Sequence, residues 1–334
     1  MDRPVPGDAV TINFLDVGQG AATLIVDHAS RKALLIDCPA GREDVVEGVL
    51  DRYSAELDVA MITHFDEDHL AGVVTLIETR SCRQLVTRVN VGYRTETDLA
   101  QHRRVLARVK RGLNFEAPRR HDGGFLGDSP GRVRWRVLSP DAVTDLTAYS
   151  AESRNRVSLV LRLEVRPLNS ASPAHHFVVA GDADGPVWRR LLAYGDDLSC
   201  YALLWPHHGG KLGTMRSPLR RDLLAACNPK IVVVSAGSRN GHRHPAQSTL
   251  EAIRESRARL MCTEVTERCH SLAMVDRGLA CSGNVELQID ASGGVHITPS
   301  VVEHRRVINA WDRPQCATQS FKIFSSEISG LTPV

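Results

Sequence analysis

Several features are scarce in this chain of 334 residues, and each scarcity excludes a class of protein. No stretch approaches the roughly 18 consecutive apolar residues of a membrane span. The N-terminal segment MDRPVPGDAV also lacks the apolar core of a signal peptide, so we expect a cytoplasmic protein with no membrane contact. The eight cysteines include no C-x-x-C pair, and we expect most of them to be small buried hydrophobes. The cysteine pattern therefore indicates neither a disulfide framework nor a zinc ribbon.

Aromatic residues and lysine are also scarce. Aromatics make up 5% of the chain, so base stacking is not expected to dominate binding of single-stranded nucleic acid. The net charge of +2 excludes a polycation of the histone type, and the basic charge is almost all arginine. A predicted helix over 97–113 carries Arg103–Arg104 and Arg108–Lys110–Arg111, and Arg119–Arg120 follow it. This basic face fits either a solvated surface in an arginine-rich proteome or a rim that binds phosphates.

What the chain has in abundance is short apolar runs that alternate with helical patterns. The runs predict strands at 10–17, 21–27, 33–38, 58–64, 86–92, 133–139, 158–165, 175–182, 201–206, 230–237, 259–265, 270–275, 285–290 and 294–299. Helical spacing occurs at 42–53, 69–79, 97–113, 185–195 and 247–257. Strands predominate in both halves, which predicts an α/β fold, an αββα sandwich of two mixed sheets flanked by helices, rather than a doubly wound parallel sheet.

Histidines and aspartates recur at the ends of the predicted strands. The densest group is THFDEDHLAGV, residues 63–73, which follows an apolar run and places four potential metal ligands within six residues. Similar positions after strands hold Asp37, Asp182, His207, His208, His242 and His244. Loops at one edge of a sheet sandwich can bring such residues together across two hundred residues of chain. Carboxylates and imidazoles are ligands of divalent metals, so the pattern predicts a metal site without cysteine.

The segment His64-Phe65-Asp66-Glu67-Asp68-His69 is similar to the metallo-β-lactamase superfamily motif, usually H-x-H-x-D-H. Its companions occur in the expected order: FLDVGQGAATLIV (14–26), LLIDCPAG (34–41), VVAGDAD (178–184), LLWPHHGGK (203–211) and VVVSAGSRNGHRHP (232–245). Together they resemble the hydrolase domain of ComEC-type DNA-uptake proteins and their stand-alone relatives, which also include choline-phosphate esterases. The resemblance covers about residues 9–257. We expect a metallo-β-lactamase-like hydrolase domain over 1–299 and a C-terminal tail over 300–334. The tail has no clear period and could be a segment that docks a protein partner or a loosely ordered extension.

The resemblance implies a site for two divalent metal ions. His64 and Asp66 would hold one ion, Asp68 and His69 the second, and Asp182 would bridge them. His207 or His208 would complete the second site, while His242 would be a further ligand or a proton donor. Asp37 would orient the ligand loop from behind. Because Asp66 replaces a histidine of the usual motif, manganese or magnesium is favoured, although zinc is not excluded.

The chemistry expected of this site gives smaller roles to other residues. His242 or His244 would protonate a leaving oxygen, Lys211 would touch a phosphate oxygen, and Asp68 would be essential for turnover. Asp16 would orient a ligand or cap the glycine turn that follows it. The superfamily usually supplies one more histidine to the first metal, but the matching stretch here offers Asn155 and Ser158. A weakly held first metal is therefore expected.

The chemistry that this site implies is metal-dependent phosphodiester hydrolysis by a metal-activated hydroxide. A bacterial nuclease is the leading expectation, with nucleic acid as the substrate. The alternatives are a hydrolase of a small substrate, such as a cyclic nucleotide, a phosphocholine ester or a thioester, and a regulatory or effector subunit of a bacterial defence-type complex. The sequence leaves open DNA against RNA, endo- against exo-cleavage, the physiological metal, the oligomeric state and the need for an activating partner.

Overall fold

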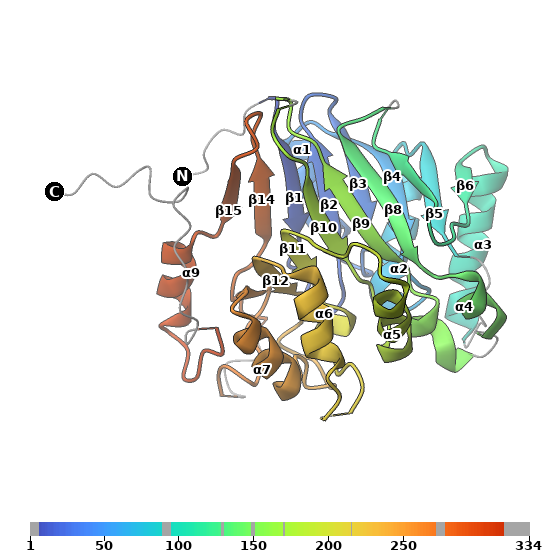
Figure 1. The fold of residues 1–334 in the computed structure, drawn as a ribbon. Helices are drawn as coiled ribbons and strands as arrows, with labels where there is room; N and C mark the ends of the chain where they lie inside the picture. The colour runs from blue at the N-terminus through green and yellow to red at the C-terminus, as the bar shows by residue number, and fades with distance from the viewer. Residues whose placement is uncertain are drawn as a thin grey trace.

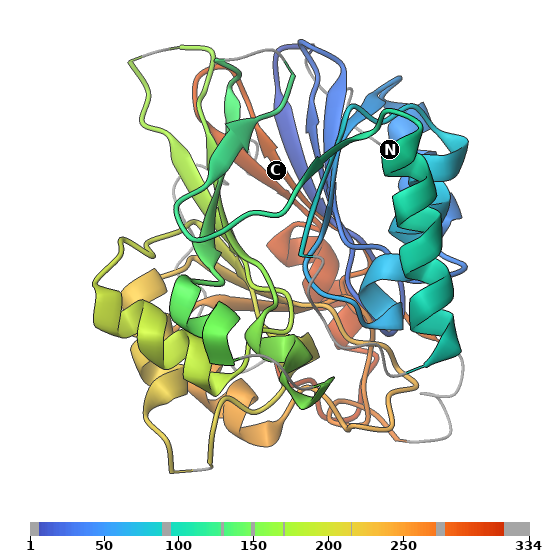
Figure 2. The same ribbon diagram turned by 90° about the vertical axis from the view of Figure 1, so that its right-hand side faces the viewer.

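Two β-sheets packed face to face form the centre of the molecule, and helices cover their outer faces (Figure 1). The structure is a computed structural model that describes residues 7–88, 95–127, 130–147, 151–169, 171–214, 216–271 and 278–316. Turned by 90°, the molecule shows the two sheets as separate layers, with α3 (Glu96–Lys110) outside one and α5 (Gly185–Tyr194) outside the other (Figure 2). The predicted αββα sandwich of two mixed sheets is confirmed.

The first sheet has the strand order β15-β14-β1-β2-β3-β4-β5-β6. Pairing is antiparallel from β15 to β3 and parallel from β3 to β6. The bounds are β1 Val10–Phe14, β2 Thr23–Asp27, β3 Lys32–Ile36, β4 Glu56–Ile62, β5 Gln84–Thr87, β6 Asn114–Glu116, β14 Val285–Ile289 and β15 Val295–Thr298. Two strands from the end of the chain therefore extend a sheet that the first hundred or so residues build.

The second sheet has the order β13-β12-β11-β10-β9-β8-β7. Its strands are parallel from β10 to β13 and antiparallel from β7 to β10. The bounds are β7 Gly123–Phe125, β8 Val133–Ser139, β9 Val160–Val165, β10 His175–Val179, β11 Ala202–Leu204, β12 Ile231–Val234 and β13 Arg259–Cys262. Parallel strands in both sheets end at an edge where loops and helix starts collect.

Helices cover both outer faces. The first sheet carries α1 (Glu43–Arg52), α2 (Glu67–Thr79) and α3, and the second carries α5, α6 (Leu219–Cys227) and α7 (Gln247–Ser256). Short elements complete the described chain: α4 (Ala142–Thr147), the 3₁₀ turns η1 (Ala151–Arg156) and η2 (His207–Gly209), and α9 (Val301–Ile308). Among the described residues, no helix has the length and apolar character needed to cross a bilayer.

Alternation along the strands explains the layers. In β3, Leu34 and Ile36 point into the core between the sheets, whereas Ala33 and Leu35 pack under the helices of the first sheet. Since successive strand residues face opposite sides of a sheet, a strand covered on both faces must be apolar at every position. The uninterrupted run IVVV of β12 is fully buried for this reason.

Some elements differ from the sequence-based expectation. The short edge strand β7 lies in a stretch for which no element was predicted, and neither α6 nor α9 was predicted. Residues 89–92 of the predicted strand 86–92 and residues 272–275 of the predicted strand 270–275 lie outside the described residues. So do residues 317–334 of the predicted tail.

The division of the chain at residue 300 stays a prediction. A capping box at Ser300 and Glu303 starts α9, and the core of the second sheet includes Ile308 and Cys316.

Candidate metal centre

The predicted ligands lie on loops that leave the carboxyl ends of neighbouring strands. Asp37 follows β3, the segment from His64 to His69 follows β4, Asp182 follows β10, and the HHG turn of η2 follows β11. Asp66 is the N-cap of α2, so Asp68 and His69 lie in the first turn of that helix. Parallel strands that end at one edge therefore bring together residues separated by more than a hundred positions.

Asp182 lies at the centre of this group, with imidazoles on both sides of its carboxylate. Its Oδ1 is 3.2 Å from His69 Nε2 and 3.5 Å from His208 Nε2. Its Oδ2 is 3.8 Å from His64 Nε2 and 3.7 Å from His207 Nε2. Each carboxylate oxygen thus faces its own pair of imidazole nitrogens, as in a carboxylate that bridges two cations.

The two aspartates of the THFDEDH segment extend the two pairs. Asp66 Oδ2 lies 3.4 Å from His64 Nε2, and Asp68 Oδ2 lies 3.5 Å from His208 Nε2. We call the residues on the Oδ2 side of Asp182 the first half-site (His64, Asp66, His207) and those on the Oδ1 side the second half-site (Asp68, His69, His208). The sequence left open which of His207 and His208 is a ligand, and the structure places one in each half-site.

The buried polar atoms of this cluster test whether it fits a cation. His64 Nε2 and Asp182 Oδ1 are buried and have no hydrogen-bond partner among the described residues. The potential ligand atoms of His64, His69 and Asp182 all lie within 4.8 Å of one another, and the same holds for Asp68, His69 and His208. Buried polar atoms without partners are rare in proteins. Imidazole nitrogens and carboxylate oxygens that converge in this way fit a divalent metal ion.

The electrostatics of the second half-site agree with that fit. Burial alone would lower the pKa of His69, but the carboxylates of Asp182 and Asp37 raise it well above its ordinary value. The pKa of His208 is raised in the same way, against the effect of burial, by Asp182 and Asp68. The carboxylates therefore create a strongly negative potential at the imidazoles, which a divalent cation would neutralise.

Asp37 fixes the orientation of His69 from behind. Its Oδ2 accepts hydrogen bonds from His69 Nδ1 at 2.7 Å and from Thr63 Oγ1 at 2.7 Å, and its Oδ1 accepts one from Thr63 N at 2.7 Å. This network keeps the proton on His69 Nδ1 and directs Nε2 toward Asp182. Asp37 thus has the contacts expected of a residue that orients a metal ligand.

Two serines that the sequence did not single out as contacts support the other ligands. The Ser235 carbonyl accepts from His208 Nδ1 at 3.0 Å, which turns Nε2 of this histidine toward Asp182. Ser158 Oγ accepts from the backbone N–H of Asp182 at 3.0 Å. Neither contact carries a sequence signal, because both depend on strands that meet only in the folded sheet.

Arg154 is the largest contribution that sequence reasoning missed. This side chain is 5% exposed, and its Nη1 donates to Asp66 Oδ1 at 2.7 Å and to the Phe65 carbonyl at 2.8 Å. It also forms an ion pair with Asp98, which belongs to the capping box of α3. Arg154 occupies one oxygen of Asp66 and leaves the other beside His64. Arg154 precedes the predicted Asn155 in η1, but it belongs to no sequence motif that could have indicated its contact with Asp66.

The remaining predicted residues belong to neither half-site. Asn155 Nδ2 is 3.5 Å from His207 Nδ1, and the ring centroid of His244 is 5.3 Å from that of His207. His242 is exposed and stacks 5.6 Å beyond His244, while Lys211 is also exposed. The structure therefore brings together all the predicted ligands except His242.

His244 is held at the rim of the site by its own loop. Asn240 accepts from the His244 backbone N–H at 2.6 Å and donates to its carbonyl at 3.0 Å. Burial, together with the nearby imidazoles of His207 and His208, lowers the pKa of His244 to about 4. The side chain is therefore neutral at pH 7, when it can donate an N–H but does not carry an imidazolium proton.

Asp16 contacts other residues than the predicted ligands. Its backbone N–H donates to Asn284 Oδ1 at 2.7 Å, and burial together with Glu264 raises the pKa of its carboxyl to about 6. The glycine turn after it does reach the site, because a Cβ at Gly20 would come within 2.6 Å of the Asp68 carbonyl. Gly20 has a φ of 125°, so glycine is required there by both backbone conformation and space.

Sequence comparison finds two curated proteins that this chain resembles. The chain is 22% identical over 272 residues to ComE operon protein 3 of Bacillus subtilis, which covers 76% of this chain and 32% of that protein. It is also 22% identical over 264 residues to Recombination protein 2 of Haemophilus influenzae, covering 76% and 28%. The chain resembles these two proteins. It spans about a third of the length of each, and the expected resemblance to the ComEC-type group is confirmed. No family model matches the chain.

Solved structures give more distant likenesses. The metallo-beta-lactamase fold protein YhfI of Bacillus subtilis superposes with a TM-score of 0.42 and 12% identity, over 73% of this chain and 93% of that one. A variant of CmlA beta-hydroxylase superposes with a TM-score of 0.45 and 12% identity, over 76% of this chain and 51% of that one.

Proposed function

We propose that this protein is a metal-dependent phosphodiesterase that uses two divalent ions, and that its substrate is a nucleic acid. The observation that carries the proposal is the position of Asp182 between the two half-sites, with each carboxylate oxygen facing two imidazole nitrogens. The resemblance to ComEC-type hydrolase domains supports the same chemistry. Manganese is the expected ion because carboxylates supply three of the seven ligands, and zinc and magnesium are the alternatives.

The residues of the site have different roles in the proposed reaction. Bound divalent ions would supply Lewis-acid stabilisation of phosphoryl charge and would lower the pKa of a water ligand. The first half-site would hold one ion and the second half-site the other, while Asp182 would set their separation. Asp37 and Ser235 would keep His69 and His208 in the required orientation. Neutral His244 would donate a hydrogen bond to the leaving oxygen from the rim.

Cations around the site support an anionic substrate. The loops that carry His207, His208 and His244 also carry four exposed basic side chains: Lys211, Arg216, Arg239 and Arg243. Because phosphate carries negative charge and these side chains project from the loops nearest the half-sites, they would attract a phosphodiester toward the site. A neutral ester or thioester would gain nothing from them.

A second basic surface favours a polymer over a small ester. The N-terminal end of α3 reaches the site through the ion pair of Asp98 with Arg154. Farther along this helix, Arg103 and Lys110 are exposed, and Lys110 is twelve residues beyond Asp98, about 18 Å along the helix axis. A small substrate would not extend that far, whereas the backbone of a nucleic acid would.

Hydrolysis assays on the metal-free protein test the proposal. Wild type, Asp68→Ala and the control Asp184→Asn would be reconstituted with manganese, magnesium or zinc and given labelled single- and double-stranded DNA and RNA, alongside bis-p-nitrophenyl phosphate. Asp184 caps α5 by accepting from Val187 N, and asparagine preserves that cap, so the control variant keeps the local fold. We expect metal-dependent cleavage of nucleic acid that Asp68→Ala abolishes and Asp184→Asn retains.

Other outcomes would replace the proposal. Cleavage of the small ester alone, with little dependence on salt, would identify a hydrolase of small phosphodiesters. No turnover by a folded and metal-loaded protein would contradict autonomous catalysis and would favour a subunit that acts through a partner.

A further inference from the structure

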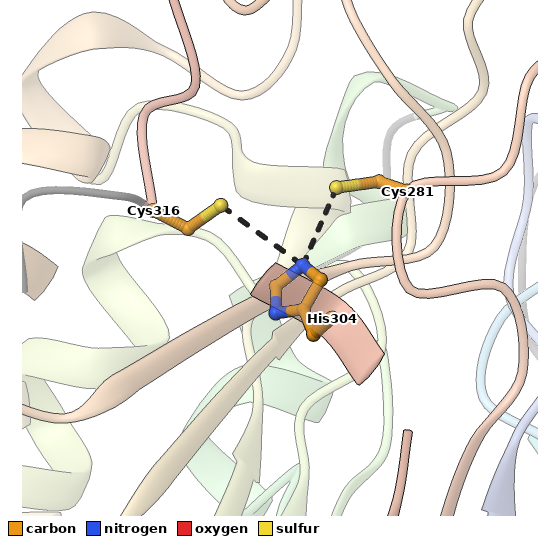
Figure 3. A group of neighbouring side chains, drawn as sticks. All are labelled: Cys281, His304 and Cys316. Atoms are coloured by element: carbon orange, nitrogen blue, oxygen red, sulfur yellow. Dashed lines mark hydrogen bonds between the residues drawn. The ribbon is translucent and has the colours of Figure 1, made fainter. Parts of the chain in front are cut away.

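A second cluster of potential metal ligands lies in the C-terminal part of the described chain. Cys281, His304 and Cys316 come from three separate segments and point toward one another (Figure 3). His304 Nε2 is 3.6 Å from Cys281 Sγ and 4.0 Å from Cys316 Sγ, and all three ligand atoms lie within 4.8 Å of one another. The three residues are buried, with exposed fractions of 4%, 2% and 4%.

Two more thiols lie beside this cluster. Burial raises the pKa of Cys262, and the neighbouring thiols of Cys269 and Cys316 raise it further. Cys281 in turn interacts electrostatically with Cys262 and Cys269. The cluster therefore offers three close ligands and two candidates for a fourth, all in one region of the core that packs against the second sheet.

The backbone around the cluster is held by hydrogen bonds that do not involve the ligand side chains. Cys262 ends β13, and its carbonyl accepts from Ser282 N at 2.8 Å, while Cys281 N donates to the Thr263 carbonyl at 2.8 Å. The Cys269 carbonyl accepts from Arg313 N at 2.8 Å, which ties the segment before Cys316 to the same loop. These bonds hold together the backbone segments that carry the thiols, whether or not an ion joins the side chains.

We propose that Cys281, His304 and Cys316 hold a structural zinc ion, with Cys262 or Cys269 as the fourth ligand. Thiolate and imidazole ligands without carboxylates are the set that zinc prefers in structural sites, where four protein ligands surround the ion. The burial of the cluster agrees with a closed site rather than a catalytic one. Ser282 Oγ lies 3.2 Å from His304 Nε2, so its hydroxyl would turn away from this nitrogen when zinc binds.

Such a site would join four segments of the chain. The ion would link the end of β13 or the loop after it, the loop that holds Cys281, α9, and the segment 309–316. In the described structure α9 contributes two buried residues, His304 and Ile308, to its packing. Zinc would therefore add a second attachment of this short helix to the second sheet, beside the packing of Ile308.

The chain offers a matched control for cysteine chemistry. Cys200 and Cys227 form another close pair of buried thiols in the same core, since a hydrogen bond with Cys200 is the main reason that the pKa of Cys227 is raised. No histidine is grouped with that pair among the potential metal clusters of the described residues. Cys227→Ser therefore removes a buried thiol of similar surroundings without touching the proposed site.

Cobalt titration of the full chain tests the proposal without reference to activity. The protein would be purified in reductant, stripped of metal and titrated with cobalt(II), whose bonds to thiolates give a charge-transfer absorption in the near ultraviolet. The metal centre at Asp182 has no cysteine among its ligands, so it would not contribute to this band. Because the centre at Asp182 also takes up cobalt, we expect the band to saturate by three equivalents, at the intensity of one thiolate-bound ion per chain. It should disappear when zinc is added in an amount equal to the cobalt, and it should be lost in Cys281→Ser but kept in Cys227→Ser.

Three results would overturn the proposal. One is a folded wild type without a thiolate–cobalt band, and this result does not depend on any variant. The second is a band that persists in both Cys281→Ser and Cys316→Ser. The third is a Cys281–Cys316 cross-linked peptide, in protein isolated without reductant, whose mass is two hydrogens lower than that of the separate thiols. That mass would identify a disulfide instead.

Discussion

The two clusters of potential ligands differ in chemistry and in access. Around Asp182, the ligands are imidazoles and carboxylates, and the side chains of Asp66, Asp68 and His207 are one-third or more exposed. Around His304, the ligands are an imidazole and thiols, and all are buried. Hard oxygen ligands beside solvent suit an ion that must meet a substrate, whereas soft thiolates in a core suit an ion that only holds segments together.

From these differences we expect the cluster around Asp182 to determine the rate of hydrolysis and the cluster around His304 to contribute to the stability of the fold. Changes around Asp182 should lower hydrolysis with little effect on unfolding, and changes around His304 should do the reverse. The variants that follow test this separation, beginning with the largest expected effect.

Asp182→Asn should have the largest effect on hydrolysis. Asparagine has one carboxamide oxygen and cannot offer a charged oxygen to each half-site. We expect kcat/KM on DNA to fall by about 10³-fold or more, because Lewis-acid stabilisation is worth several kcal/mol and each 1.4 kcal/mol is tenfold in rate. Steady-state kinetics with Asp184→Asn as the control checks this, and a decrease in both variants would indicate damage to the loop rather than to the site.

Asp37→Asn should have an intermediate effect. Asparagine accepts a positive φ, which is 60° at this position. Its amide has a single acceptor oxygen, so it cannot accept all three hydrogen bonds that the carboxylate accepts from His69 and Thr63. We expect metal affinity or activity to fall by about 10–100-fold. Manganese titration measures the affinity, and an unchanged dissociation constant would show that the Asp37 network does not orient the ligand.

Neutralising the exposed cations of α3 should have a smaller effect that is specific to polymers. For Arg103→Gln with Lys110→Gln, we expect the slope of log affinity for double-stranded DNA against log salt to decrease by about 2. Turnover of bis-p-nitrophenyl phosphate should not change. The control is Arg134→Gln with Arg166→Gln, since both residues lie at the end of the second sheet opposite Asp182. Equal slopes for the two double variants would remove α3 from the binding surface.

Cys281→Ser should have the smallest effect on hydrolysis and a clear effect on stability. The two clusters share no ligand, so we expect kcat to change by less than about twofold. The melting temperature should fall by about 5–10 °C, because a structural metal site contributes directly to folding and 1 kcal/mol corresponds to about 2–4 °C in a large domain. Thermal unfolding of Cys281→Ser and Cys227→Ser, each with and without chelator, checks this, and equal decreases would argue against a zinc site.

The contrast between the clusters also explains what the sequence could predict. His64, Asp66, Asp68 and His69 lie within six residues directly after an apolar strand, so their pattern is visible without a structure. Arg154 contacts Asp66 although the two residues are 88 positions apart in the sequence, so no local pattern predicts that contact. The Cys–His cluster was not predicted for the same reason. Its ligands at 281, 304 and 316 come from separate segments and form no C-x-x-C pair.

The fold was predictable to a similar extent. Long apolar runs such as those of β4 and β12 are buried on both faces, and their length and composition indicate strands directly. The edge strands β6 and β7 have three residues each and expose polar or glycine positions, so they lack a period that could be recognised. α9 is short, and its capping box at Ser300 and Glu303 is a stronger signal than its apolar spacing.

Manganese loading tests the central claim, that Asp182 joins two half-sites which each hold an ion. Manganese prefers oxygen and nitrogen ligands over thiolates, so it should report on this centre and not on the Cys–His cluster. We predict two manganese ions per wild-type chain, with an electron paramagnetic resonance spectrum that shows magnetic coupling between them, and loss of that coupling in Asp182→Asn. A wild-type chain that binds a single uncoupled ion, or coupling that survives in Asp182→Asn, would contradict the account.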